Sequence, residues 1–175
     1  MLVFPSFLPT IASGRPFATN SEANEAPHHK KKMIKEIHDG DRLMALLISE
    51  RFAKPGITFF TEGSLSQQLA FMQHPPGKRI APHVHNPVHR DVTSTQEVLL
   101  LRKGRLRVDF YRQDQSYLES HVMGAGDLIL LIQGGHGFEV LEEIEMFEVK
   151  QGPYAGDSDK TRFEPVSSED IKLIE

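Results

Sequence analysis

Residues 77–104 read GKRIAPHVHNPVHRDVTSTQEVLLLRKG, and this stretch decides the expected fold. It contains two histidines, His83 and His85, followed by a glutamate, Glu97, that begins an apolar run. If residues 83–85 are extended, alternate side chains share a face, and the two imidazoles lie roughly 6.5 to 7 Å apart along the strand. Two imidazoles and a carboxylate in one walled site suit a divalent first-row metal ion. The stretch therefore predicts a metal site that begins on a strand.

A fourth candidate ligand, His136, lies in the glycine-rich segment QGGHG at 133–137. One histidine alone would favour a residue that merely hydrogen-bonds inside a barrel. Two histidines at this spacing, a glutamate and a further histidine favour a metal site instead. His89 is a rival ligand, because HxHxxxH is also a plausible donor set. Alternatively, the loop that carries His89 contacts substrate.

The composition of the chain argues against several classes of function. The chain has 175 residues, a formal net charge of −4 and no cysteine. This length suits one domain with a substantial core. The negative charge argues against a nucleic-acid partner, and the absence of cysteine excludes disulfides and thiolate metal sites. No run of about 18 apolar residues is present, so we expect no membrane span and a cytoplasmic protein.

Three regions follow from the patterning. Residues 1–32 are rich in Pro, Ser, Asn and Ala without periodicity, which predicts a poorly ordered N-terminal extension. Met33 begins the first patterned segment, and we expect translation to start there naturally. Residues 33–155 are expected to form a single barrel domain, and residues 156–175 a polar C-terminal tail.

Short apolar runs recur along the barrel region, separated by Gly, Asp and Pro turns, which predicts an all-β sandwich or barrel. The expected strands are 33–37, 43–48, 57–61, 65–73, 83–85, 97–101, 106–112, 117–123, 128–132, 138–141 and 144–150. The segments 97–101 and 106–112 are expected to form a hairpin across residues 102–105. Because the run 97–101 is apolar on both faces, it is expected to lie between two packed layers.

The motif spacing resembles the two signatures of the cupin superfamily. The first signature is matched by Gly77, His83, His85, Glu97 and Gly104. The second is matched by Gly126-Asp127, a glycine-rich turn and His136. Eleven residues separate His85 from Glu97, more than cupins usually place there, so we expect a longer loop.

This resemblance covers residues 55–150 and implies a cupin-type double-stranded β-helix, which is a jelly-roll barrel. It implies that His83, His85, Glu97 and His136 hold a divalent transition metal inside the barrel. Iron, manganese, nickel and zinc all remain open as its identity. Related cupins often dimerise, so we expect a homodimer that binds a small-molecule ligand.

Some similar small, single-domain cupins sit in gene clusters for surface-polysaccharide or nucleotide-sugar synthesis. The resemblance implies a fold and a metal site but no particular reaction. Our leading hypothesis is a metal-dependent isomerase or epimerase, and the gene clusters favour a sugar or sugar-nucleotide as its substrate. With iron(II), the same ligands would support an iron-dependent dioxygenase. A non-catalytic binding or sensing cupin is a further alternative. So is a metal-free ketoisomerase-like cupin in which His83 and His85 act as acid and base.

Arg107, Asp109 and Tyr111 alternate along one face of an expected strand. If that face lines the barrel, Arg107 and Tyr111 bind a substrate carboxylate or phosphate, Arg107 through its bidentate fork. If the face points outward, both are ordinary surface residues, and we favour this second interpretation. Tyr154 follows the last strand and either covers the barrel or packs against it.

Overall fold

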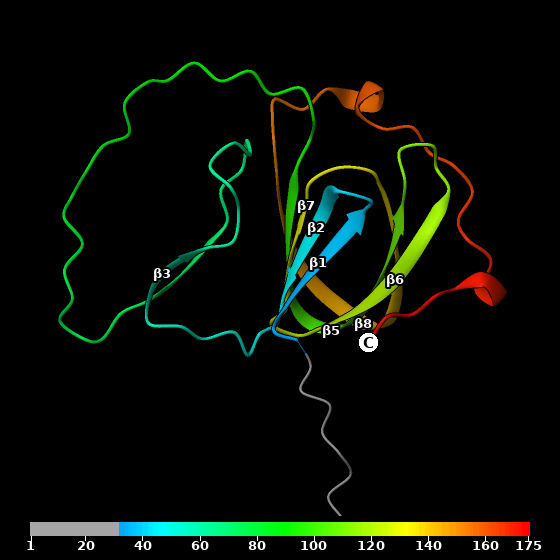
Figure 1. The fold of residues 1–175 in the computed structure, drawn as a ribbon, viewed down its shortest axis with the longest axis horizontal. Coiled ribbons are helices and arrows are strands. Elements are labelled where there is room, and N and C mark those ends of the chain that lie inside the picture. The colour runs from blue at the N-terminus through cyan, green and yellow to red at the C-terminus, as the bar shows by residue number, and fades with distance from the viewer. Residues whose placement is uncertain (1–31) are drawn as a thin grey trace, which may run out of the picture. The chain divides into compact units, whose positions relative to one another are not determined.

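The computed structural model describes residues 32–175, which are mainly strands and connecting loops (Figure 1). The strands are β1 (Ile34–Asp39), β2 (Arg42–Ile48), β3 (Gly56–Phe59), β4 (Ala70–Gln73), β5 (Glu97–Tyr111), β6 (Tyr117–Gly124), β7 (Leu128–Leu131) and β8 (Gly135–Lys150). Two short 3-10 helices, η1 (Gly156–Asp159) and η2 (Ser168–Asp170), follow β8. The predicted all-β class is confirmed. The extension predicted at 1–32 lies, except for Lys32, outside the described residues.

No helix within residues 32–175 is long and apolar enough to cross a membrane.

Six strands form one antiparallel sheet. Five of them follow the order β1-β2-β7-β5-β6, and the sixth, β8, pairs with β5. The first half of β5 pairs with β7 and the second half with β6. Since β8 pairs with both halves, it occupies the opposite edge of β5 throughout. The β5–β8 ribbon is therefore the longest element of the sheet.

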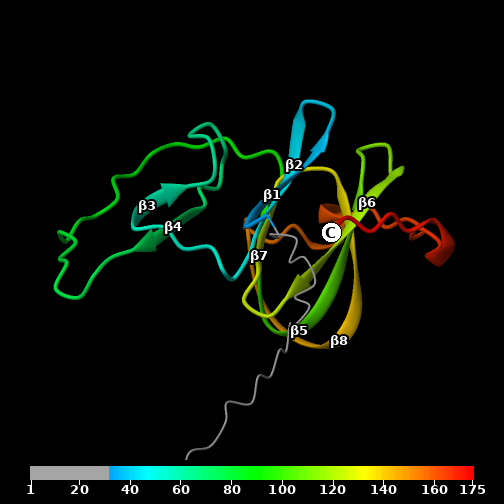
Figure 2. The ribbon, with the colours of Figure 1, turned by 60° about the horizontal axis from the view of Figure 1, so that its bottom comes forward.

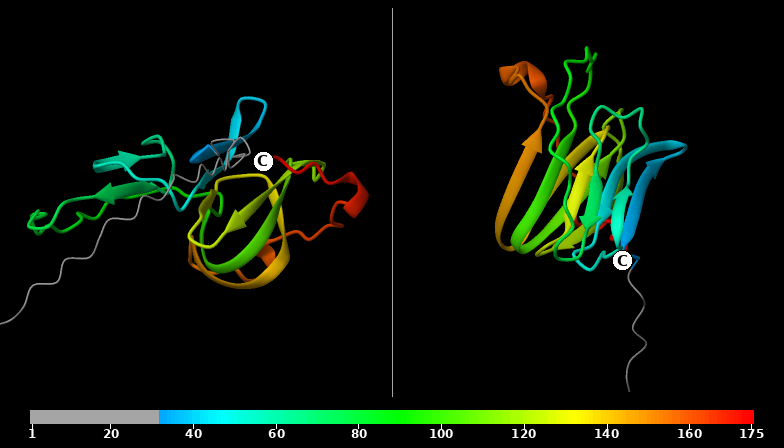
Figure 3. Two further views of the ribbon diagram at one scale, coloured as in Figure 1. Left: turned by 90° about the horizontal axis from the view of Figure 1, so that it is seen from below. Right: turned by 90° about the vertical axis from the view of Figure 1, so that its left-hand side faces the viewer.

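This ribbon bends sharply at Gly104. The register between β5 and β8 shifts three times between Leu101 and Leu106, and such bulges bend and twist a strand pair. Gly104 has a φ of 84°, and a Cβ atom there would lie 2.0 Å from the carbonyl oxygen of Glu143. Only glycine tolerates both conditions. As a result the ribbon curls over on itself (Figures 2 and 3).

The predicted hairpin across residues 102–105 is wrong. β5 continues from Glu97 to Tyr111, and its halves pair with β8 rather than with one another. Gly104, a residue that favours turns, instead allows a bend within a continuous strand. Similarly, residues 142–143, expected to form a turn between two strands, lie inside β8. Sequence periodicity finds the apolar segments on both sides of the bend but does not reveal which strand each one pairs with.

Opposite charges face one another across the bend. The three ion pairs are Arg102–Glu145, Lys103–Glu143 at 2.6 Å and Arg105–Glu142 at 3.3 Å. All six side chains are largely exposed, so each pair adds at most about 1 kcal/mol to stability. Their main effect is on register, because a basic stretch of β5 is complementary to an acidic stretch of β8.

The core has two layers, one on each face of the sheet. The larger layer fills the curl, and its buried members are Ile37, Met44, Ala45, Leu47, Leu99, Leu101, Leu106, Val108, Phe110, Met123, Ile129 and Leu131. The smaller layer, Leu46, Leu130 and Ile132, packs against partly buried residues that include Phe60, Leu69 and Val98. Leu99 and Val98 thus contribute to opposite layers. The prediction that residues 97–101 lie between two packed layers is confirmed for Val98, Leu99 and Leu101, whereas Leu100 remains exposed.

The segment that carries the histidine pair contains no strand. β3 and β4 form a separate two-stranded sheet, and residues 74–96 then run to β5 without ladder pairing. The strand predicted at 83–85 is therefore wrong. Pro82 and Pro87 flank this segment, and prolines cannot donate to a ladder. Residues 75–95 are all exposed.

The C-terminal tail is anchored to β6. Leu173 forms an isolated parallel bridge with Ser120. The Tyr117 hydroxyl accepts a hydrogen bond from the Lys172 backbone N–H at 2.9 Å and contacts the Ser120 hydroxyl at 2.7 Å. Ser120, which is fully buried, donates in turn to the Asp109 carboxylate at 2.5 Å. A buried polar chain thus links the tail to the sheet, as expected for polar groups removed from water.

We predict that Gly104→Ala lowers the free energy of unfolding by at least about 2 kcal/mol, because it adds a steric overlap to the cost of a positive φ. Gly40→Ala is the matched control, since Gly40 also has a positive φ, 60°, but a Cβ atom there meets nothing within 4 Å. It should cost about 1 kcal/mol. Urea denaturation measures both, and equal losses would contradict the bend.

Candidate functional site

The bend brings together two of the predicted ligands, Glu97 and His136. Glu97 begins β5, opposite Lys150 at the end of β8, whereas His136 lies near the start of β8, opposite Phe110. Thirteen residue steps separate Glu97 from Phe110, roughly 43 Å along a straight strand. The His136 Nε2 atom nevertheless lies 3.2 Å from the Glu97 Oε2 atom. The two side chains meet because the ribbon is folded over.

The Glu97–His136 pair is partly shielded from water. The Glu97 side chain is 8% exposed and that of His136 is 29% exposed. The His136 imidazole, within hydrogen-bonding distance, is the largest influence on the pKa of Glu97 and holds it below its ordinary value of 4.5. Partial burial raises this pKa, while the positive charges of Lys160 and Lys150 lower it further. Glu97 is therefore an ionised acceptor at neutral pH.

The exposed histidines lie apart from this pair. The rings of His83 and His85 are 5.3 Å apart between centroids, and His83 Nδ1 lies 3.0 Å from the backbone oxygen of Ala81. His89 lies 3.8 Å from Asp91, with both side chains exposed. Across residues 32–175, no three His, Asp or Glu side chains form a group that could hold a metal ion. The structure thus shows the predicted ligands as two separate pairs.

Arg107 and Tyr111 are engaged within the protein. Arg107 donates two hydrogen bonds to the Asp109 carboxylate, at 2.7 and 3.0 Å, and forms an ion pair with Glu139. The bond to Asp109 raises the pKa of Arg107 above its usual value. Tyr111 is buried, and its hydroxyl accepts a hydrogen bond from the backbone N–H of Val166. Arg107 therefore links β5 to β8, and Tyr111 links β5 to the tail. The favoured interpretation of both as ordinary surface residues is wrong, because these contacts largely cover them.

Sequence reasoning missed a second histidine–carboxylate pair. His121 is buried on β6, with Nε2 at 2.8 Å from Glu119 Oε1, and its ring meets the Phe110 ring edge-on at 5.8 Å. The two residues are two apart on a strand and so share a face. The two-residue spacing could have indicated this pair from the sequence. An isolated Glu-x-His pattern, however, is too common to predict a functional site by itself.

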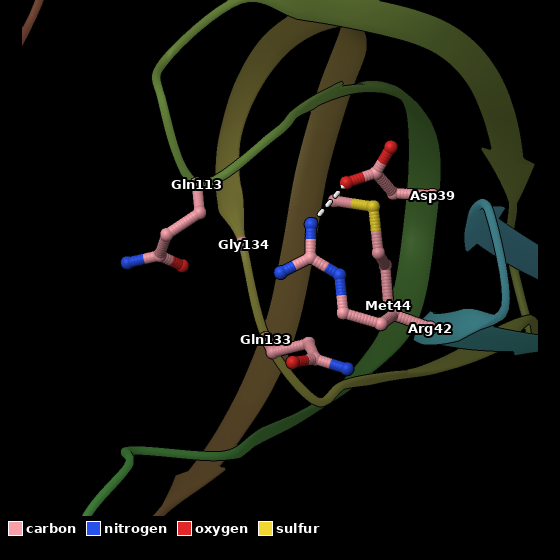
Figure 4. Close-up of a pocket in the computed structure, with 6 residues that line it drawn as sticks. All are labelled: Asp39, Arg42, Met44, Gln113, Gln133 and Gly134. Carbon is pink, nitrogen blue, oxygen red and sulfur yellow. Dashed lines mark hydrogen bonds and ion pairs between the residues drawn. The ribbon is translucent and has the colours of Figure 1, made fainter.

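One narrow hollow lies near the start of β8. It is lined by Asp39, Arg42, Met44, Gln113, Gln133 and Gly134 (Figure 4). The Arg42 side chain extends into it and donates to Asp39 at 2.5 Å. The Met44 methyl group packs over Gly134 so closely that a Cβ atom there would lie 2.4 Å from it. The hollow contains none of the predicted site residues and is filled by its own side chains.

An apolar groove lies between β3–β4 and the face of the sheet away from the curl. Its lining residues are Ile48, Ser49, Glu50, Phe52, Phe60, Leu69, Ala70, Phe71, Leu100, Gly126 and Leu128. Phe52 meets the rings of Phe60 and Phe71 edge-on at 5.0 and 5.2 Å. Polar groups that could carry chemistry are nearly absent from this lining, so the Glu97–His136 pair is the better candidate site.

Comparison of the chain with protein-family models, with curated proteins and with solved structures gives no match. The candidate site is therefore identified by the geometry of the Glu97–His136 pair.

We predict that Glu97 makes stability depend on pH in the acid range. A carboxylate whose pKa is lowered by folding stabilises the folded state above its unfolded pKa, and this stabilisation is lost as pH falls through the lowered value. Between about pH 5 and about pH 3, the free energy of unfolding of the chelator-treated wild type should fall more than that of Glu97→Gln. Glu148→Gln, which removes an exposed carboxylate from β8, is the control and should follow the wild type. Parallel curves for wild type and Glu97→Gln would contradict the pairing.

Proposed function

We propose that this protein is a cupin-type metal-binding enzyme acting on a sugar or sugar-nucleotide, with isomerase or epimerase chemistry. The observation that carries the proposal is the 3.2 Å approach of His136 Nε2 to Glu97 Oε2 across the folded ribbon. An imidazole and an ionised carboxylate, both partly shielded from water, are suitable ligands for a divalent transition metal such as iron, manganese, nickel or zinc. The signature-like spacing of residues 77–104 and 126–136 supports the cupin assignment.

The distance between these two atoms fits the proposed ion. With metal–ligand bonds of about 2.0 to 2.2 Å, two neighbouring ligand atoms on one metal lie roughly 3.0 to 3.5 Å apart. The 3.2 Å separation falls within this range. A bound divalent ion would supply Lewis-acid polarisation of a substrate carbonyl or hydroxyl. Glu97 and His136 would hold it, and the bend at Gly104 would fix their separation.

His83 and His85 complete the donor set in this proposal. They lie in the exposed segment 74–96, which leads directly into Glu97. Eleven residues separate His85 from Glu97, enough chain for the imidazoles to reach the pair. His89 is the next candidate donor on the same segment. Binding metal through this segment would hold it against the site, so metal affinity and the position of the segment would be coupled.

A metal-free acid–base function is the second candidate. Glu97 and His136 already form a carboxylate–imidazole pair without any further residue. In such a pair the carboxylate fixes the orientation of the imidazole, whose other nitrogen then exchanges a proton with substrate. Two further metal-dependent possibilities remain. One is a protein that binds a ligand at the metal site without turning it over, and the other is an iron-dependent dioxygenase. Metal content separates the metal-free function from all of the metal-dependent ones.

We predict that protein purified without a histidine tag binds one divalent transition metal ion per chain, measured by elemental analysis after reconstitution and desalting. His136→Ala and Glu97→Ala should each lose the metal, because each removes one of the two converging ligands. His38→Ala, which removes an exposed histidine of β1, is the matched control and should retain it. Circular dichroism verifies that every variant is folded.

The double variant His83→Ala, His85→Ala tests the role of the exposed segment. Loss of metal from this variant supports a four-ligand site. Retention would restrict the site to Glu97 and His136. A wild-type protein that takes up no metal would refute the metal proposal and leave the acid–base pair.

We also propose that the protein is a homodimer. Apolar side chains remain exposed on the face of β5 and β8 away from the curl, namely Leu100, Phe147 and Val149. They adjoin the apolar groove, since Leu100 lines it. Burying such a surface is a common basis for association. Light scattering at micromolar concentration should give twice the chain mass, and a monomeric mass would refute the proposal.

A further inference from the structure

The end of β8 and the residue that follows it lie beside Glu97. Lys150 is the cross-strand partner of Glu97, so both side chains lie on the same face of the ribbon. Gln151, the next residue, exchanges hydrogen bonds with Gln96 through its side-chain oxygen and its backbone N–H. The end of β8 is therefore fixed to β5 immediately beside the candidate site.

Asp159 links the end of β8 to the segment that precedes β5. Its carboxylate accepts a hydrogen bond from the Thr95 hydroxyl at 3.0 Å and lies 3.5 Å from the Lys150 ammonium. The Asp159 side chain is only 15% exposed. Thr95 lies two residues before Glu97, so η1 and the start of β5 are held together at this point.

The Lys150 ammonium keeps hydrogen-bonding capacity in this arrangement. Its side chain is 24% exposed; it forms an ion pair with Asp159, lies 5.4 Å from the centre of the Tyr154 ring, and its charge also acts on Glu97. An ammonium has three donors, whereas none of them makes a hydrogen bond of normal length within the described part of the chain. A partly buried cation with unused donors is suited to an anionic group.

Tyr154 supplies an aromatic surface next to this cation. The ring is 74% exposed, although aromatic side chains usually bury most of their area. Lys150 lies within cation–π distance on one side. The exposed ring surface is therefore available to a flat or ring-shaped group, next to the Lys150 ammonium that can receive a negative charge.

We propose that Lys150 and Tyr154 form a binding subsite for an anionic sugar. The sugar ring packs on Tyr154, and the phosphate or carboxylate of the ligand accepts hydrogen bonds from Lys150, with Lys160 adding positive charge nearby. The ligand then extends toward Glu97 and His136. Anionic sugars would then be the substrate class of the proposed enzyme, and any reaction of the bound sugar rests on the proposed function. Binding to the subsite requires no metal.

The test measures binding to metal-free protein by isothermal titration with three probes: glucose 1-phosphate, glucuronate and glucose. We expect the wild type to bind at least one anionic sugar more tightly than glucose. Tyr154→Ala should weaken that binding at least tenfold, and Tyr154→Phe should preserve it because the ring remains. Lys150→Met should remove the preference for the anionic sugar over glucose.

Two variants control for effects away from the subsite. Phe59→Ala removes an exposed aromatic ring on β3, and Lys103→Met removes an exposed lysine at the bend. Both should bind as the wild type does. No binding of either anionic probe to the wild type, or equal binding by Tyr154→Ala, would overturn the proposal. Since metal content is measured separately, failure of the subsite is distinguishable from failure of the metal site.

Discussion

The sharp bend of the β5–β8 ribbon at Gly104 is the constraint on which the rest of this structure depends. Without it, Glu97 and His136 would lie at opposite ends of a long antiparallel pair. With it, the inward faces of the two halves enclose one apolar layer that includes Leu99 and Val108. Burial of that layer provides the driving force, and the glycine removes the steric obstacle. The same bend thus produces both the packed core and the geometry of the site.

The chain uses its charges differently at the two ends of the folded ribbon. At the bend, exposed ion pairs such as Lys103–Glu143 align the strands and add little stability. At the open end, Glu97 and His136 meet where water is partly excluded, so their interaction is stronger. Lys150 and Asp159 extend this polar group toward solvent. Polar residues that could bind a ligand are therefore concentrated at this end of the ribbon, whereas the groove on the other face of the sheet is apolar.

Local pattern was enough to predict much of the fold. The pattern at 106–112 correctly predicted a strand, on which Leu106, Val108 and Phe110 are buried, and the apolar run at 97–101 correctly indicated a strand with core residues on both faces. Pairing was not predictable, because the partner of β5 lies some forty residues along the chain and its register depends on bulges. For the same reason, sequence alone could not place Lys150 beside Glu97. The histidine segment was misjudged because its prolines outweigh its extended pattern.

A distance measured along β8 shows whether the β5–β8 ribbon is folded over. The chain has no cysteine, so nitroxide labels can be attached at Phe138→Cys and Val149→Cys, two exposed positions on β8. On a straight strand the eleven residue steps between them span roughly 36 Å. Pulsed electron paramagnetic resonance should give a distance well below that value. A distribution centred near the straight-strand length would contradict the bend and, with it, the meeting of Glu97 and His136.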